Sequence, residues 1–156
     1  MAYRHVLGFS DLPSIYNISL PVGPNMPNVT DDVMLVQTLL KMANFTCNGA
    51  DCGVEASHRI NIDGYFGQQT ERMIAAFEAY MRENHLLLNA DGVLEPASND
   101  GYTGTGIIYK IIHLNRFAKQ ATPLGTRYEE LPNDPHTDPT LRRSLLTQTS
   151  VATYGT

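Results

Sequence analysis

The sequence of 156 residues contains no apolar run of about 18 residues, the length that a membrane-spanning helix needs, so no membrane span is expected. Positive charge is also scarce. The 11 Lys and Arg residues against 16 Asp and Glu give a formal net charge of -5, so a nucleic acid is not an expected partner. Residues 1–9 lack the apolar core and the small-residue cleavage site of a secretory signal. We therefore expect a protein that is cytoplasmic, or one that reaches the periplasm or the exterior by a non-classical route.

Cysteine is limited to Cys47 and Cys52. The segment between them contains Asn48-Gly49, which favours a tight turn, so the pair could close a small disulfide loop. The alternative is two reduced thiols in a loop, which the missing secretory signal favours. Two thiols without a second pair or a close histidine are too few ligands for a metal site.

Catalytic motifs are missing as well. The sequence contains no Gly-x-Ser-x-Gly, no His-Glu-x-x-His and no phosphate-binding loop. The 5 histidines lie far apart and show no ligand spacing. We therefore expect a binding module with no enzymatic activity, no cofactor and no metal.

The segment around which the chain is organised is 63–70, Asp-Gly-Tyr-Phe-Gly-Gln-Gln-Thr. Asp63-Gly64 is a turn pair, in which the aspartate accepts backbone hydrogen bonds and the glycine supplies a positive φ. Gly67 leaves room for a close backbone approach. At least one ring of Tyr65 and Phe66 is expected to fill the core beneath the helix that follows, which runs from residue 68 to about residue 85.

Two more helices flank this one. The first is expected to begin with Thr30 as its cap and to bury a stripe of apolar residues, with Gln37 making a structural hydrogen bond to a turn rather than contacting a ligand. The third is expected to start at a cap formed by Thr103 or Thr105 and to end near residue 121. Its isoleucines, at positions 107, 108, 111 and 112, predict a central core helix.

The two ends of the chain have a different pattern. Residues 3–20 alternate in a way that predicts a hairpin, with an extended arm as the alternative. In residues 122–156, prolines favour an extended chain. One short helix is predicted near 139–147, where Asp138 precedes Pro139 and Leu141 and Leu145 are spaced by four.

The central segment resembles a known family. Its Asp-Gly-x-Phe-Gly-x-x-Thr pattern is similar to the signature of the small three-helix peptidoglycan-binding domains. The upstream segment 33–40 matches the family's Val-x-x-Leu-Gln-x-x-Leu pattern in part, and Asp91-Gly92 stands where a second Asp-Gly usually follows the middle helix. The resemblance covers about residues 28–121. The residues that carry the signature are Asp63, Gly64, Phe66, Gly67, Thr70, Met73, Ile74, Phe77 and Glu78.

The resemblance implies an all-α fold. In this prediction a three-helix domain at 28–121 carries an N-terminal hairpin or arm at 1–27 and a Pro-rich C-terminal extension at 122–156. The implied function is non-catalytic binding of bacterial cell wall peptidoglycan, through its glycan or its stem peptide, in a groove between the first helix and the turn. The candidate ligand-binding residues are Asp63, Tyr65, Gln68 and Gln69. The residues expected to build the turn are Gly64, Phe66, Gly67 and Thr70.

A second hypothesis is a structural interaction module. In this alternative, residues 1–27 and 122–156 contact protein partners and hold together a larger assembly, such as a phage-tail-like or contractile injection particle. The apolar face formed by Leu141, Leu145 and Leu146 would serve as the anchor.

Overall fold

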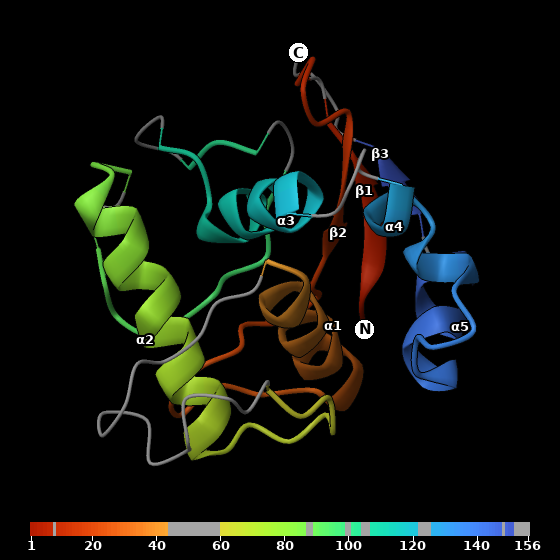
Figure 1. Cartoon of the computed structure of the whole chain (residues 1–156), viewed down its shortest axis with the longest axis horizontal. Coiled ribbons are helices and arrows are strands. Elements are labelled where there is room, and N and C mark those ends of the chain that lie inside the picture. The colour runs from red at the N-terminus through yellow and green to blue at the C-terminus, as the bar shows by residue number, and fades with distance from the viewer. Residues whose placement is uncertain are drawn as a thin grey trace.

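The structure is a computed structural model, and it describes residues 1–7, 9–43, 60–86, 89–98, 101–103, 107–121, 126–147 and 149–151. Cys47 and Cys52 lie outside these residues, so their pairing stays a prediction. The elements follow one another along the chain as shown in Figure 1. They are β1 (Tyr3–Val6), β2 (Ser14–Asn17), α1 (Thr30–Met42), α2 (Gln68–Glu83), α3 (Lys110–Ala121), α4 (Thr126–Glu129), the 3-10 helix η3 (Leu131–Asn133), α5 (Pro139–Thr147) and β3 (Thr149–Val151).

The three strands form one mixed sheet in the order β2-β1-β3. β1 and β2 pair antiparallel, as the hairpin prediction expects, and Tyr3 lies opposite Asn17. β3 pairs with β1 in parallel, and Arg4 lies opposite Thr149. The prediction of an all-α fold is therefore wrong, and the protein is a mixed α/β structure. The sequence signal failed because a strand of three residues is too short to show alternation, and its partner lies at the other end of the chain.

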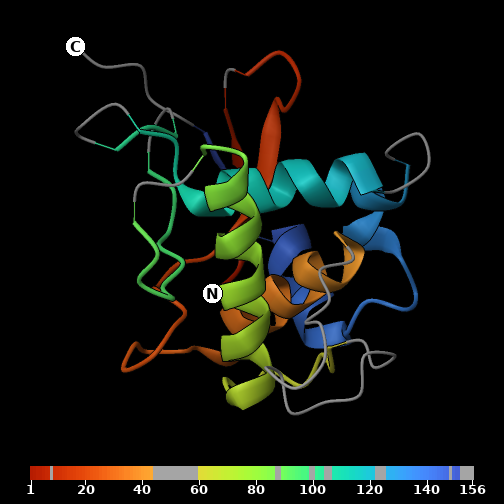
Figure 2. The same ribbon diagram turned by 60° about the vertical axis from the view of Figure 1, so that its left-hand side comes forward.

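The helices lie in layers beside this sheet. α1 and α3 pack against each other, and both contact β2. α2 contacts α1 and lies on the side of α1 and α3 that faces away from the sheet, as Figures 1 and 2 show together. α5 contacts β1 and α1. Of the described helices, none is both long enough and apolar enough to cross a membrane.

One hydrophobic core joins the three segments predicted from the sequence, which are 1–27, 28–121 and 122–156. Leu12, Ile15 and Ile18 enter it from the N-terminal segment, and Leu141 and Leu145 enter it from α5. The central helices contribute Leu35, Leu39, Ile74, Phe77 and Ile111, all of which are fully buried. The two ends of the chain are therefore part of the same packed unit as the middle.

Two of the predicted helix starts need correction. Thr30 is the first residue of α1 rather than its cap, because Val29 holds the extended cap position without a side-chain hydrogen bond. α3 begins at Lys110, so the predicted cap at Thr103 or Thr105 is wrong. The reason is a local turn in which the Thr103 amide donates to the Ile107 carbonyl at 2.7 Å and the Ile107 amide donates to Thr103 Oγ1 at 3.2 Å.

The C-terminal segment is more structured than its prolines predict. α5 confirms the short helix expected at 139–147. The preceding residues, predicted to be extended, contain α4 and η3 instead. Tyr128 on α4 is buried, and its hydroxyl donates to Asn115 Oδ1 at 2.5 Å. Tyr16 donates from its hydroxyl to the Tyr128 carbonyl at 2.8 Å, so α4 is fixed to both β2 and α3.

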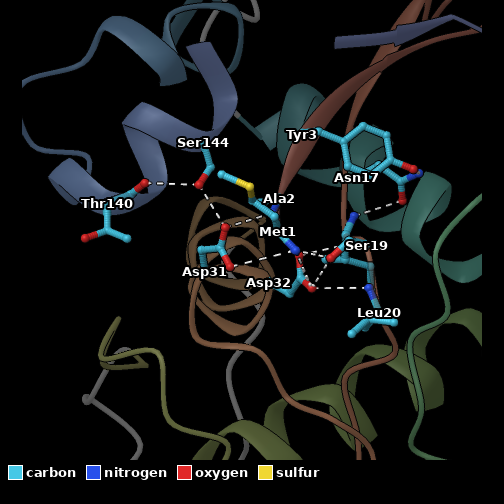
Figure 3. Close-up of polar contacts among 11 residues, drawn as sticks. Met1, Ala2, Tyr3, Asn17, Ser19, Leu20, Asp31, Asp32, Thr140 and Ser144 are labelled. Atoms are coloured by element: carbon cyan, nitrogen blue, oxygen red, sulfur yellow. Dashed lines mark hydrogen bonds and ion pairs between the residues drawn. The ribbon is translucent and has the colours of Figure 1, made fainter. Parts of the chain in front are cut away.

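Asp31, at the start of α1, connects the two ends of the chain. Its Oδ2 accepts a hydrogen bond from the Ala2 amide at 3.0 Å and another from Ser144 Oγ on α5 at 2.8 Å (Figure 3). Asp31 is 7% exposed, so these bonds compensate the cost of burying its carboxylate.

Asp32, the next residue, holds the segment that follows β2. Its carboxylate accepts hydrogen bonds from the Ser19 amide at 3.1 Å, Ser19 Oγ at 2.8 Å and the Leu20 amide at 3.2 Å. The amino nitrogen of Met1 lies 3.2 Å from Oδ2 of the same carboxylate (Figure 3). Asp32 is fully buried, and this set of donors explains how a carboxylate is accommodated there.

Candidate functional site

The first Asp-Gly turn has the backbone that its sequence predicts. Gly64 has φ of +74°, which confirms the positive φ expected of it. Asp63 Oδ1 accepts a hydrogen bond from the Tyr65 amide at 3.0 Å, as an aspartate at the start of such a turn does. The Gly67 amide donates to the Tyr65 carbonyl at 3.1 Å, and α2 starts directly afterwards at Gln68.

Gln37 on α1 holds this turn through the hydrogen bonds of its side-chain amide. Its Oε1 accepts from the amides of Asp63, at 3.0 Å, and Gly64, at 2.9 Å. Its Nε2 donates to Asp63 Oδ1 at 2.9 Å, to the Tyr65 carbonyl at 3.1 Å and to Thr70 Oγ1 at 3.0 Å. Gln37 is 1% exposed, so its amide satisfies the buried polar groups of the turn. The prediction that Gln37 makes structural hydrogen bonds is confirmed.

The space between α1 and the turn, where the sequence predicts a groove, is occupied by these contacts. Besides Gln37, Thr30 approaches so closely that a Cβ placed on Gly64 would lie 2.6 Å from Thr30 Cγ2. Gly64 itself is buried. The surface available to a ligand is therefore the outer side of the turn.

The four candidate ligand-binding residues differ in what their side chains do. Tyr65 is 72% exposed, the largest exposure among the large hydrophobic residues found at the described surface. Gln68 is also exposed. Asp63 is exposed, but its Oδ1 already accepts the two bonds described above. Gln69 is half-buried, and its Oε1 accepts from the Asn61 amide at 2.9 Å. Tyr65 and Gln68 are thus the side chains that the turn itself uses least.

The residues expected to build the turn take positions consistent with that role. Phe66 is half-buried and packs against the core, so it is the ring that fills the space beneath the turn. Thr70 is 2% exposed and accepts a hydrogen bond from Gln37. Gly67 has φ of -113°, a value open to any residue, so its role is spatial.

The absence of a side chain at Gly67 leaves room for the Tyr65 ring. A Cβ placed on Gly67 would lie 3.0 Å from Tyr65 Cε1 and 3.2 Å from Cδ1. The ring therefore lies against the Gly67 backbone, although most of its area faces solvent. This contact limits the positions that the ring can take.

The second Asp-Gly turn repeats the arrangement with charged groups. Gly92 has φ of +77°, and its amide donates to both carboxylate oxygens of Glu78 on α2, each at 3.1 Å. Asp91 Oδ1 accepts from the Val93 amide at 3.0 Å. Lys110 Nζ lies 2.9 Å from Glu78 Oε2 and 2.7 Å from Asp91 Oδ1. Partial burial opposes the charge on Asp91, but the hydrogen bonds from Lys110 and Val93 outweigh it and lower the pKa of this carboxyl.

The roles of Glu78 and Lys110 were missed by sequence reasoning. A signal for Glu78 exists, because Phe77-Glu78 repeats the pattern of Val36-Gln37, a core residue followed by a side chain that can accept hydrogen bonds from a later Asp-Gly turn. The partnership of Lys110 has no such signal, since it depends on where α3 begins. Within the described part of the chain, no group of three or more His, Cys, Asp and Glu residues is placed to hold a metal ion.

Comparison of the chain with models of known protein families, with curated proteins and with solved structures finds no match. The residues of the turn and the resemblance that they carry are therefore the basis for inferring a function.

Proposed function

We propose that this protein binds bacterial cell wall peptidoglycan without catalysis, on the outer side of the turn at residues 63–70. The observation that carries the proposal is the Tyr65 ring, which is 72% exposed on a turn that Gln37 holds through five hydrogen bonds. Sugar recognition uses flat aromatic faces beside a few fixed polar groups. Gln68, next to Gly67 at the start of α2, offers such a polar group.

The turn is held by a neutral side chain, which favours an uncharged ligand. Gln37 is neutral and supplies both donors and acceptors, so the turn is held without a buried charge beneath Tyr65. The carboxylate of Asp63 is stabilised by hydrogen bonds from Gln37 Nε2 and the Tyr65 amide. A neutral glycan chain meets no strong opposing field from these groups. We therefore favour the glycan over the charged stem peptide as the part of the wall that contacts Tyr65.

The assembly alternative loses the observation that motivated it. The face of α5 predicted to anchor a partner is largely used within the chain, since Leu141 and Leu145 are fully or almost fully buried in its own core. Leu146 is exposed, but a single exposed leucine is ordinary on a protein surface. No specific contact in the described residues favours this alternative over wall binding.

The test is co-sedimentation of the full chain with purified sacculi. The full chain is needed because a fragment of residues 28–121 would lose core residues from both ends. We expect the wild-type protein to sediment and Tyr65→Ala to bind about 5- to 30-fold more weakly, corresponding to the roughly 1–2 kcal/mol that a stacking ring contributes. Absence of wild-type sedimentation would overturn the proposal.

Two further variants test whether binding depends on the position of the Tyr65 ring and not only on its presence. Gly67→Ala keeps Tyr65 and an allowed backbone but requires the ring to shift by a few tenths of an ångström, so we expect a small loss of binding. Alanine is a poorer N-cap than glycine, so we also expect a modest loss of stability. Tyr80→Ala is the matched control, because Tyr80 is 46% exposed in the last part of α2, about 18 Å along the helix from its start. Equal losses of binding in Tyr65→Ala and Tyr80→Ala would contradict a site at the turn.

A further inference from the structure

A second concave site lies between the sheet and the C-terminal segment, far along the chain from the turn. It is a cavity of about 190 Å³ whose walls come from β1, β2, α4, η3, α5 and β3. Figure 1 shows α4 and α5 beside the sheet, on the side that faces away from α2. At roughly 30 Å³ for each water molecule, the volume corresponds to about six non-hydrogen atoms. This size suits a small molecule or the end of a larger one.

The polar groups of this cavity are one cation and several groups that can both donate and accept hydrogen bonds. Arg4 brings a guanidinium, Ser14 and Thr149 bring hydroxyls, and Asn133 brings an amide. Arg4 Nε donates to Ser14 Oγ at 3.3 Å, which orients the guanidinium. Among the described residues, Arg4 forms no ion pair with a carboxylate. Guanidinium groups bind carboxylates through paired hydrogen bonds, so the Arg4 guanidinium favours a carboxylate ligand.

The acidic residue of the cavity is only partly compensated. Glu129 Oε1 lies 3.2 Å from Lys119 Nζ, but burial together with the Glu129 charge still raises the pKa of Tyr16 in the same lining. The remaining lining residues are Tyr16, Tyr128, Pro132, Leu145 and Leu146, of which Leu146 is 56% exposed. The apolar side chains among them suit a ligand that carries a short aliphatic group next to its carboxylate.

We propose that this cavity binds a small carboxylate with a short aliphatic substituent, with Arg4 as its anchor. Two sources have this chemistry: the C-terminal residue of a peptide and a free short-chain acid. The site is separate from the turn and from the proposed wall surface, so either one can fail without the other.

The experiment is a titration of the full ¹⁵N-labelled chain, followed by two-dimensional NMR, with sodium isobutyrate and with N-acetylalanine. The matched controls are isobutyramide and N-acetylalanine amide, which keep the shape and remove the charge. We expect saturable shifts at the amides of Arg4, Ser14 and Thr149 with at least one acid, and binding at least about tenfold weaker for its amide. Tighter binding of N-acetylalanine identifies a peptide end, and tighter binding of isobutyrate identifies a free acid.

Three variants assign the binding to the cavity. Arg4→Gln should weaken binding of the acid about tenfold or more, whereas Arg82→Gln on α2 should leave it unchanged. Glu129→Gln removes a nearby negative charge and should strengthen binding by about two- to fivefold. Arg4 is exposed, so the melting temperature of Arg4→Gln should stay close to that of the wild type. Equal binding of acid and amide, shifts confined to other residues, unchanged binding in Arg4→Gln, or no shift at 50 mM ligand would each overturn the proposal.

Discussion

Replacement of Gly64 by alanine tests the description of the first turn most directly. The φ of +74° disfavours an L-residue by about 1–2 kcal/mol. The new Cβ would lie 2.6 Å from Thr30 Cγ2 and 3.1 Å from the Thr30 carbonyl oxygen, and such overpacking adds about 1–3 kcal/mol. The reduced freedom of the unfolded chain offsets about 0.4–1 kcal/mol. The free energy of unfolding should therefore fall by about 1–4.5 kcal/mol.

The same substitution at Gly92 provides a matched control. Its φ of +77° is nearly the same, but a Cβ there would have only ordinary contacts, the nearest with Pro24 Cδ at 3.7 Å. We therefore expect Gly92→Ala to cost only about 0–1.5 kcal/mol, since the overpacking contribution is missing. In the Gly64→Ala background, Thr30→Ser removes the clashing methyl group and should recover about 1 kcal/mol.

Urea denaturation followed by circular dichroism measures the free energy of unfolding of the wild type, Gly64→Ala, Gly92→Ala and the Gly64→Ala/Thr30→Ser double variant. Equal losses in the two glycine variants would show that Thr30 does not press on the turn. A Gly64→Ala protein as stable as the wild type would refute the positive φ as well, and with it the way Gln37 holds the turn.

Three other predictions concern pH, a buried carboxylate and the core. Burial lowers the pKa of His113 from 6.5 to about 4, with a smaller contribution from a nearby arginine, so the folded protein keeps this imidazole neutral. The stability that this neutral imidazole contributes is present above pH 6.5 and is lost as the pH falls towards 4. Between pH 7 and 4.5, the free energy of unfolding of His113→Gln should therefore fall by about 2 kcal/mol less than that of the wild type, as measured by urea denaturation. Asp32→Ala leaves buried donors without an acceptor and should lower the free energy of unfolding by about 2–4 kcal/mol. The control Asp11→Ala, at an exposed residue, should lower it by under about 1 kcal/mol. A similar cost for both variants would contradict the network around Asp32. Phe77→Ala and Ile111→Ala should each lower the unfolding free energy by roughly 3–5 kcal/mol, and stable variants of both would refute the packing of α2 on α3 and α1.

The parts of the fold that the sequence predicts correctly are those with local signals. α2 is preceded by a glycine-containing turn and has a long apolar stripe, and α5 has a proline in its first turn and leucines spaced by four. The function of Gln37 could also be predicted, because the turn that it serves has its own signature. These elements need no knowledge of distant segments.

The parts that were predicted wrongly depend on contacts between distant segments. β3 is a strand because β1, near the other end of the chain, pairs with it. α4 is a single turn of helix among prolines, held by Tyr128 and its hydrogen bond to Asn115 on α3. α3 starts at Lys110 rather than near Thr103, and Thr103 forms hydrogen bonds with Ile107 instead. In each case tertiary contacts decide between local conformations of similar intrinsic preference.

The two Asp-Gly turns have similar backbone conformations but are held by different side chains. Both place a positive-φ glycine after an aspartate, and both receive a side chain from an earlier helix. Gln37 can donate and accept, so it satisfies its turn without a counter-ion. Glu78 can only accept when ionised, and burial of its charge is compensated by Lys110. The charged arrangement therefore requires α3 nearby, whereas the neutral one is complete with α1 alone. On the outer side of the first turn, Tyr65 and Gln68 are exposed.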